Sequence, residues 1–235
     1  MKKGKQIYEG KAKKLYETDD KNLYIQEFKD DATAFDATKR GTIKNKGIVN
    51  NRISAKMFEL LEKNGVKTHF IKLLSDREML VKRLEIIPVE VTIRNIVAGG
   101  MAKMLGLEEG IRIKEPVLEY HYKNDKLHDP LFNEYHIRAL SLATDGELEK
   151  IKSYSFGIND VLRDFFSKKG LELVDFKLEF GRHKGEILLG DEISPDTCRL
   201  WDKATQKKMD KDRFRRDLGD VEETYQEVLK RIEGD

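Results

Sequence analysis

The stretch that decides the fold is LVDFKLEFG, residues 173–181. Apolar and charged side chains alternate along it, and the side chains of a strand point alternately to the two faces of a sheet. The pattern therefore predicts a strand with one buried apolar face, made of Val174, Phe176, Leu178 and Phe180. Asp175, Lys177 and Glu179 share the other face. They form either an ordinary charge ladder on a half-exposed strand or the wall of a ligand site.

The next strand favours the ligand site. It is predicted from Glu186 to Ile193, across a turn from Gly181 to Gly185, and it ends in an acidic pair, Asp191 and Glu192. In a hairpin the end of one strand lies beside the start of the other, so we expect Asp191 next to the row of charges. Converging carboxylates without a His or Cys neighbour suit magnesium, which takes one or two carboxylates plus substrate phosphates. A plain surface turn would have the same spacing.

Hydrophobic periodicity outward from these strands predicts an α+β fold in two lobes. The first lobe, residues 1–84, is a small antiparallel sheet with one helix: strands at 6–9, 14–17, 23–28, 67–74 and 78–84, and a helix through 48–61. The second lobe, residues 85–235, holds the two strands above. Its other predicted elements are strands at 89–93 and 116–122, short helices, a long helix from 145 to 170 and a final amphipathic helix through 221–232.

The composition limits the classes of function. The chain has 45 Lys and Arg against 43 Asp and Glu, a formal net charge of +2. This near balance argues against a nucleic-acid partner, because proteins that neutralise phosphates usually carry a basic excess. The single cysteine, Cys198, excludes an intrachain disulfide framework and favours a reducing cytoplasm. We expect no membrane partner, since the sequence contains no apolar run of spanning length.

A tight turn near the N-terminus is a candidate phosphate site. It lies in YEGKAKKLY, residues 8–16, between two predicted strands. Its small residues would let backbone amides approach phosphate oxygens, and Lys11 and Lys13 add positive charge on one side. The spacing of a Walker A loop is absent. A solvated basic hairpin remains the competing interpretation.

Two further segments carry candidate anion-binding arginines. In VEVTIRNIVAGG, residues 89–100, a strand delivers Arg94 to an Ala-Gly-Gly turn before a helix, which is a plausible cradle for an anion. A salt-bridged arginine at a helix entry would look the same. In DEISPDTCRLWD, residues 191–202, Arg199 follows the acidic strand through a loop. The mixed charges at residues 211–216 are interpreted as a helix surface.

Taken together, these motifs resemble the SAICAR synthetase family (phosphoribosylaminoimidazole-succinocarboxamide synthase). The resemblance spans almost the whole chain, through residues 8–13, 49–51, 74–76, 88–94, 123–125, 128–130, 173–181, 190–192, 194–196, 199–202 and 210–215. It implies an ATP-dependent ligase of purine biosynthesis that joins carboxyaminoimidazole ribotide to L-aspartate, giving SAICAR, ADP and phosphate. It also implies a kinase-like N-terminal lobe that covers ATP against the larger lobe. We further expect a homo-oligomer, with a dimer favoured.

The resemblance also implies roles for individual residues. Phosphates would be held by Lys11, Ala12 and Lys13, adenine by Leu15, Lys82, Leu84 and Ile86, and magnesium by Glu179 and Asp191. The ribotide would be bound by Arg94, Gly99, Gly100, Asp196 and Arg199. Asp175 and Lys177 would face the reacting carboxylate with Lys13 as a third catalytic residue, and Lys211 and Arg215 are assigned to aspartate. One position departs from the family: its usual Ala-Gly-Ser reads Ala98-Gly99-Gly100, so a hydroxyl donor to the substrate phosphate is missing.

Two other classes of function share parts of this pattern. A small-molecule kinase would use the same glycine turn and metal carboxylates but would phosphorylate a hydroxyl group and need no aspartate. A nucleotide-regulated binding module would bind ATP without consuming it. Release of phosphate from ATP that depends on both the ribotide and L-aspartate would separate the ligase from both alternatives.

Overall fold

The computed structural model describes residues 1–34 and 38–234, and it has the expected α+β class. The N-terminal part forms an antiparallel sheet with the strand order β1-β2-β3-β7-β6. Its strands are β1 (Lys3–Glu9), β2 (Lys13–Thr18), β3 (Leu23–Phe28), β6 (Phe70–Leu73) and β7 (Glu78–Lys82). Helix α1 (Lys46–Lys63) packs against β3, β6 and β7, and a small hairpin joins β4 (Asp31–Ala34) to β5 (Lys39–Thr42). The predicted strands and helix of this part are confirmed.

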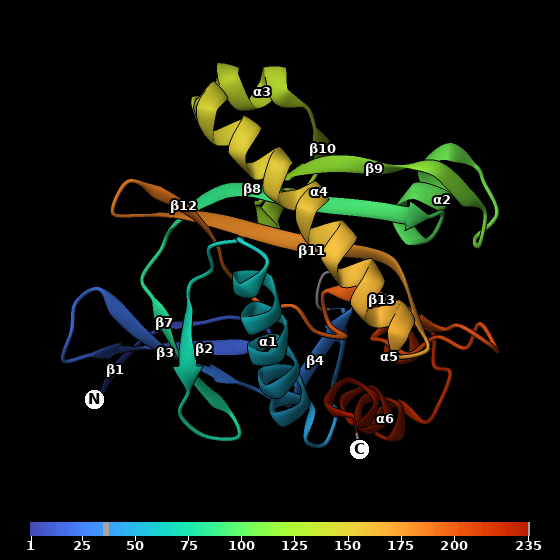
Figure 1. Cartoon of the computed structure of the whole chain (residues 1–235), viewed down its shortest axis with the longest axis horizontal. Helices are drawn as coiled ribbons and strands as arrows, with labels where there is room; N and C mark the ends of the chain where they lie inside the picture. Colours follow the sequence, from blue (N-terminus) through green and yellow to red (C-terminus); the bar gives the residue numbers. More distant parts are fainter. Residues whose placement is uncertain (35–37, 235) are drawn as a thin grey trace.

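The C-terminal part is built on a second antiparallel sheet with the order β10-β9-β8-β11-β12, and β13 pairs with β11. Its strands are β8 (Glu85–Ile96), β9 (Arg112–Tyr122), β10 (Leu131–Phe132), β11 (Leu171–His183), β12 (Glu186–Leu189) and β13 (Cys198–Asp202). The long helix α4 (Asp145–Lys168) runs across one face of this sheet, as Figure 1 shows. The other face of β11 is therefore free to form the wall of a site.

Short helices and the chain end complete the fold. They are α2 (Gly99–Leu105), η1 (Asp125–Leu127), α3 (Glu134–Ala139), α5 (Asp212–Arg215) and α6 (Val221–Glu233). The C-terminal helix α6 returns to pack against α1 (Figure 1). Backbone bonds join the two sheets as well, because the His69 N–H donates to the Leu189 carbonyl at 2.8 Å and the Leu189 N–H donates to the Lys67 carbonyl at 3.0 Å. The division into lobes at residue 84 stays a prediction.

Helix α4 begins as its sequence predicts, but the prediction that Phe165 lies on its buried face is wrong, because Phe166 is buried there and Phe165 is only half-buried. The Thr144 side chain accepts a hydrogen bond from the Glu147 N–H, and the Glu147 carboxylate accepts one from the Thr144 N–H. This reciprocal capping box satisfies amides that the helix itself leaves unpaired. The buried face of the helix comprises Leu148, Ile151, Ile158, Leu162 and Phe166. These side chains share one core with Phe176, Leu178 and Phe180 of β11.

The predicted faces of β11 are correct except at Val174. The register of β11 against β13 shifts between Leu173 and Asp175, which marks a β-bulge. The bulge changes the alternation, so Leu173 joins the main core with Phe176. Val174 instead packs on the opposite side with Ile96, Ala98 and Trp201. The prediction that Val174 shares the face of Phe176 is therefore wrong.

The predicted turn from Gly181 to Gly185 is also wrong, because β11 continues to His183. Gly181 pairs with Ile86 on one side and Leu188 on the other. A Cβ atom at Gly181 would lie 2.8 Å from the Leu84 Cβ, so this strand position needs a glycine for close packing. The turn is made by residues 184–185 alone, and the following strand ends at Leu189 rather than Ile193.

Two segments have more structure than the sequence indicates. Residues 198–202, interpreted as a loop, form β13 along β11, and Cys198 is buried there. The charged cluster at 211–216 is only partly a surface, since Asp212 is 1% exposed and Arg213 is 5% exposed. Long-range pairing with β11 and with buried carboxylates produces both features, and neither has a local sequence signal. Among the described residues, no helix is long and apolar enough to cross a membrane.

Candidate active site

The structure brings Glu179 and Asp191 together, as the hairpin argument predicts. The Gly190 N–H donates to the Glu179 carbonyl at 2.8 Å, which places the residue after Gly190 beside Glu179. Asp191 itself has a left-handed backbone with φ 57°. Its side chain therefore does not follow the alternation of the preceding strand. Burial and the nearby charge of Asp191 raise the pKa of Glu179 above its usual range. Two half-buried carboxylates thus lie side by side near the C-terminal part of β11.

Two lysines neutralise these carboxylates. Lys13 forms ion pairs with Asp191 and, at 3.0 Å, with Glu192. Lys123 donates to the Glu179 carboxylate at 2.6 Å. Burial opposes the charge on Lys13, but Asp191 and Glu192 outweigh it and raise the pKa of the ammonium group. Lys123 was not among the predicted site residues, and its only signal was its place in the Lys-Asn-Asp segment at 123–125.

The glycine turn is connected to this charged cluster through Lys13, the residue that closes it. The turn between β1 and β2 is closed by the Gly10 N–H, which donates to the Lys13 carbonyl at 2.8 Å. Lys11 reaches across to Asp125 of η1 at 2.8 Å. Ala12 is half-buried, and its carbonyl accepts from the Lys29 N–H at 2.8 Å. The turn therefore connects the N-terminal sheet with the segment that carries Lys123.

The residues assigned to adenine lie on both sides of the link between β7 and β8. Leu84 packs against the glycine next to Asp191, since its Cδ1 would lie 2.7 Å from a Cβ atom at Gly190. The Lys82 ammonium donates to the Thr68 carbonyl at 2.9 Å. Leu15 is half-buried and Ile86 is 41% exposed. These residues thus offer apolar surface beside the charged cluster.

The donor set at the end of β11 fits magnesium. Among residues 1–34 and 38–234, no group of three His, Cys, Asp or Glu side chains forms a ready-made metal cage. Glu179 and Asp191 offer two carboxylates rather than a complete ligand set. Magnesium commonly binds one or two carboxylates together with substrate phosphates. The two lysines supply positive charge at the same place. A metal here would therefore be completed by a phosphate ligand.

A network of buried arginines and carboxylates adjoins this cluster on β11. Asp175 accepts from Arg94 at 2.8 Å and from Arg199 at 2.9 Å. Arg94 also pairs with Glu119 at 2.8 Å, and Arg199 with Asp212 at 3.0 Å. All five side chains are less than 20% exposed. On the charged face of β11, Asp175 is thus paired with two guanidinium groups and does not meet bulk water, whereas Lys177 is half-exposed.

The Gly99-Gly100 turn is the first turn of α2, not a turn before the helix as predicted, and it lies beside both arginines. Gly99 has a left-handed backbone with φ 54°, and a Cβ atom there would collide with the Arg199 guanidinium. The conformation and the contact both require glycine at this position. At Gly100 a Cβ atom would lie 3.5 Å from Arg94 Nη2, an ordinary contact. The serine that the family usually has at this position would therefore fit.

A second buried cluster surrounds Asp196. Its carboxylate accepts from Lys46 at 2.8 Å, from Lys211 at 3.4 Å and from the Tyr225 hydroxyl at 2.7 Å. Burial alone would raise the pKa of Asp196, but the Lys211 and Lys46 ammonium groups lower it well below its usual range. Lys46 and Tyr225 were missed at the sequence level. They come from α1 and α6, which no local spacing connects with Asp196.

The other predicted residues lie at the edges of these clusters. The Lys177 side chain is 48% exposed and pairs with Glu90 at 2.7 Å. Arg215 donates to Asp212 at 2.7 Å and so lies next to the Arg199 network. Both basic side chains are therefore held by acidic partners, Glu90 and Asp212.

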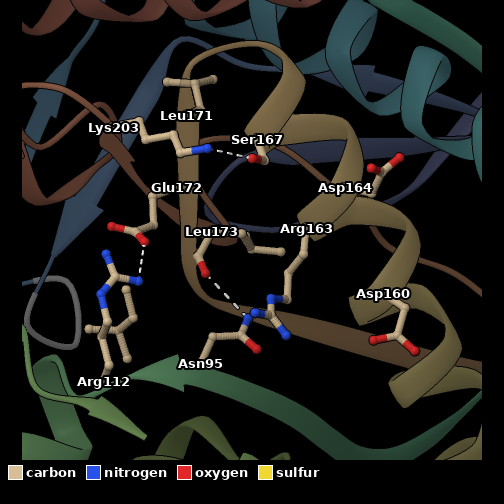
Figure 2. Close-up of a pocket in the computed structure, with 11 residues that line it drawn as sticks. Asn95, Arg112, Asp160, Arg163, Asp164, Ser167, Leu171, Glu172, Leu173 and Lys203 are labelled. Carbon is tan, nitrogen blue, oxygen red and sulfur yellow. Dashed lines mark hydrogen bonds and ion pairs between the residues drawn. The ribbon is translucent and has the colours of Figure 1, made fainter.

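A separate pocket lies on the α4 side of the sheet. Its volume is about 460 Å³, and it opens between α4, the start of β11 and the end of β8 (Figure 2). Several of its charged groups are paired with one another or with nearby polar groups. Arg112 binds Glu172 at 2.6 Å, and Lys203 donates to the Ser167 hydroxyl at 2.8 Å. No predicted site residue lines this pocket.

The fold and the site define a class before any comparison is made. A glycine turn with lysines, a pair of carboxylates and a wall of buried arginines suit an α+β enzyme that assembles phosphate-bearing anions. Comparison with known proteins gives the particular family. The SAICAR synthetase family profile matches residues 6–232, so the chain belongs to the SAICAR synthetase family.

Individual relatives agree along the full length. A phosphoribosylaminoimidazole-succinocarboxamide synthase of Thermoanaerobacter sp. (strain X514) is 61% identical over 234 residues, covering 100% of both chains. The crystal structure of that synthase from Ehrlichia chaffeensis has a TM-score of 0.96 at 48% identity and covers 98% of this chain and 99% of its own. A SAICAR synthetase (Type-2) in complex with ADP has a TM-score of 0.94 at 51% identity and covers 97% of each chain. The expected family, fold class and function, an ATP-dependent ligase that forms SAICAR in purine biosynthesis, are confirmed.

Proposed function

We propose that the ligase reaction takes place between the glycine turn and the charged face of β11, with ATP and the ribotide on adjoining clusters. The observation that carries the proposal is the continuity of charge along β11. Glu179 pairs with Lys123 beside the pair of Lys13 and Asp191, and Asp175 pairs with two arginines four residues earlier on the same strand. Asp175 and Glu179 lie on the same face of β11, about 13 Å apart along the strand with Lys177 between them. Phosphate-bearing ligands are long enough to span this distance. One phosphoryl group could therefore pass between ligands held by the two clusters.

The reaction requires ATP, the ribotide and L-aspartate, all of them anions, to bind next to one another. A carboxylate resists attack by an amine because its leaving group would be oxide. In the proposed reaction a ribotide carboxylate oxygen attacks the γ-phosphorus of ATP, and the bond to ADP breaks. The aspartate amine then attacks the acyl carbon, phosphate leaves with the carboxylate oxygen, and the nitrogen loses a proton. Positioning and charge stabilisation lower both barriers.

The nucleotide occupies the N-terminal side in this proposal. Lys11, Ala12 and Lys13 hold its phosphates under the turn. Adenine lies against Leu15, Lys82, Leu84 and Ile86. The similar structure with ADP supports nucleotide binding by this fold, and the half-buried apolar side chains beside the turn support the place of the base.

Magnesium is assigned to Glu179 and Asp191. When bound, it would neutralise charge on the phosphates during transfer. The side chains of the protein prepare this place, because Lys13 and Lys123 already compensate the two carboxylates. The same lysines can turn to phosphate oxygens when ATP is present.

The ribotide occupies the arginine side, where Arg94, Arg199, the Gly99-Gly100 turn and Asp196 surround it. Asp175 orients the two guanidinium groups, and Lys177 faces the reacting carboxylate. L-Aspartate is assigned to Lys211 and Arg215, whose charges suit its two carboxylates. A homodimer working in the cytoplasm completes the proposal.

The deciding experiment measures phosphate release from ATP with the ribotide and L-aspartate added separately and together. Strict dependence on both supports the ligase assignment for this chain. Phosphorylation of a hydroxyl compound without aspartate would support a kinase. Binding of ATP without release of phosphate would support a regulatory module.

A further inference from the structure

Glu109 binds the turn that the proposed function assigns to the ribotide. It lies in the segment between α2 and β9, and its carboxylate accepts from the Gly99 N–H at 2.9 Å. The Arg216 guanidinium donates a hydrogen bond to each carboxylate oxygen of Glu109, at 2.5 and 2.8 Å. Lys208 lies 3.4 Å away. The Glu109 side chain is 28% exposed, so solvent only partly screens these contacts.

This contact links two distant parts of the chain. Glu109 and Arg216 are 107 residues apart, and they connect the Gly99 turn with the segment after α5. Arg216 also reaches Asp212 at 3.5 Å, and Asp212 holds Arg199 at 3.0 Å. A bidentate arginine–carboxylate pair fixes the orientation of the two side chains as well as their distance. The turn and Arg199 are thus held by one connected set of charges.

The turn and Arg199 also depend on each other sterically. The Arg199 guanidinium lies directly against the Gly99 α-carbon, in the space that a Cβ atom would fill. Gly99 keeps φ 54°, a backbone conformation that costs glycine little but is easily changed. A turn released from Glu109 could therefore move and take the Arg199 guanidinium out of position.

We propose that Glu109 is a positioning residue, which with Arg216 holds the Gly99-Gly100 turn against Arg199 and so preforms the ribotide side of the site. The inference rests on the proposed place of the ribotide. A competing role has the opposite consequence. If the Glu109 carboxylate only occupied the place of a substrate anion, its neutralisation would strengthen ribotide binding.

The test is steady-state kinetics of Glu109→Gln, which keeps the size of the side chain and an oxygen for the Gly99 N–H. We expect the ribotide KM to rise about three- to tenfold, from the loss of a partly screened charged hydrogen bond, with kcat and the ATP KM unchanged. Arg216→Gln should produce the same selective rise. The double variant should show little further change, because both substitutions break one contact. Glu186→Gln is the matched control, since its ion pair with Lys67 is exposed and outside these clusters.

Several results would overturn the inference. A ribotide KM that is unchanged or lower contradicts positioning, even if the melting temperature falls. Equal rises in the ATP and ribotide KM values would show general loosening, and additive effects of the two variants would show independent roles. Arg199→Gln separates the inference from its premise. If Arg199→Gln raises the ribotide KM and Glu109→Gln does not, only the inference fails, whereas no effect of Arg199→Gln contradicts the proposed ribotide site.

Discussion

Replacement of Asp175 by asparagine should destabilise the protein strongly while hardly changing its shape. The Asp175 side chain is 5% exposed and lies between the guanidinium groups of Arg94 and Arg199. Removing one partner of a buried ion pair costs about 3–5 kcal/mol, because a charge stays buried without compensation. Each arginine keeps a second carboxylate, Glu119 or Asp212. We therefore expect the lower end of that range, about 3 kcal/mol.

This loss can be measured by equilibrium urea unfolding and by thermal melting. For a chain of this length, about 3 kcal/mol corresponds to a fall in Tm of roughly 6–12 °C. Glu186→Gln is again the control, because its exposed pair should contribute less than about 1 kcal/mol. The ribotide should raise the Tm of Asp175→Asn, since a bound anion would compensate the two arginines. A loss of stability below about 1 kcal/mol would refute the reasoning that Asp175 holds this network together.

Three further outcomes follow from the same contacts. Glu179→Gln or Asp191→Asn should each abolish ATP-dependent product formation in a folded protein, and near-normal turnover with magnesium would contradict the metal assignment. Gly100→Ser should leave the ribotide KM equal or lower, because the added Cβ makes an ordinary 3.5 Å contact with Arg94. A large rise in the ribotide KM would contradict the idea that Gly100 lacks a hydroxyl donor to the substrate phosphate. The hydrogen bond from Arg182 lowers the pKa of Glu147 from 4.5 to about 2. Glu147 therefore stabilises the fold above pH 4.5 and loses that contribution as the pH falls toward 2. Urea unfolding at pH 5 and pH 3 should show a smaller difference for Glu147→Gln than for the wild type, and equal differences would contradict the assignment.

Periodicity predicted the elements whose burial follows a local rule. The helix α4 has both a capping box and a regular apolar face, and the alternation of β11 from Asp175 onward matches its two environments. Val174 was assigned to the wrong face because a bulge depends on the partner strand. Gly181 was interpreted as a turn because its close contact with Leu84 comes from another segment. Local patterns carry no information about such distant neighbours.

In the site, too, residues joined by a short connection could be predicted, and residues brought together from distant segments could not. The hairpin argument placed Asp191 beside Glu179, since only one short connection separates them. Lys46, Glu109 and Tyr225 escaped detection, because each reaches the site from a different part of the chain. Each also belongs to a residue type that is usually exposed or structural. Only the packing of α1, α6 and the loop after α2 shows what these side chains contact.

The most direct test of the account is a crystal structure of the protein with ADP, magnesium and the ribotide. The account predicts nucleotide phosphates against Lys13, the metal between Glu179 and Asp191, and the ribotide against Arg94 and Arg199. Both ligands should then lie on the charged face of β11, with their reacting groups toward each other. Nucleotide bound away from the glycine turn, or a ribotide bound without contact to Arg94 and Arg199, would contradict it.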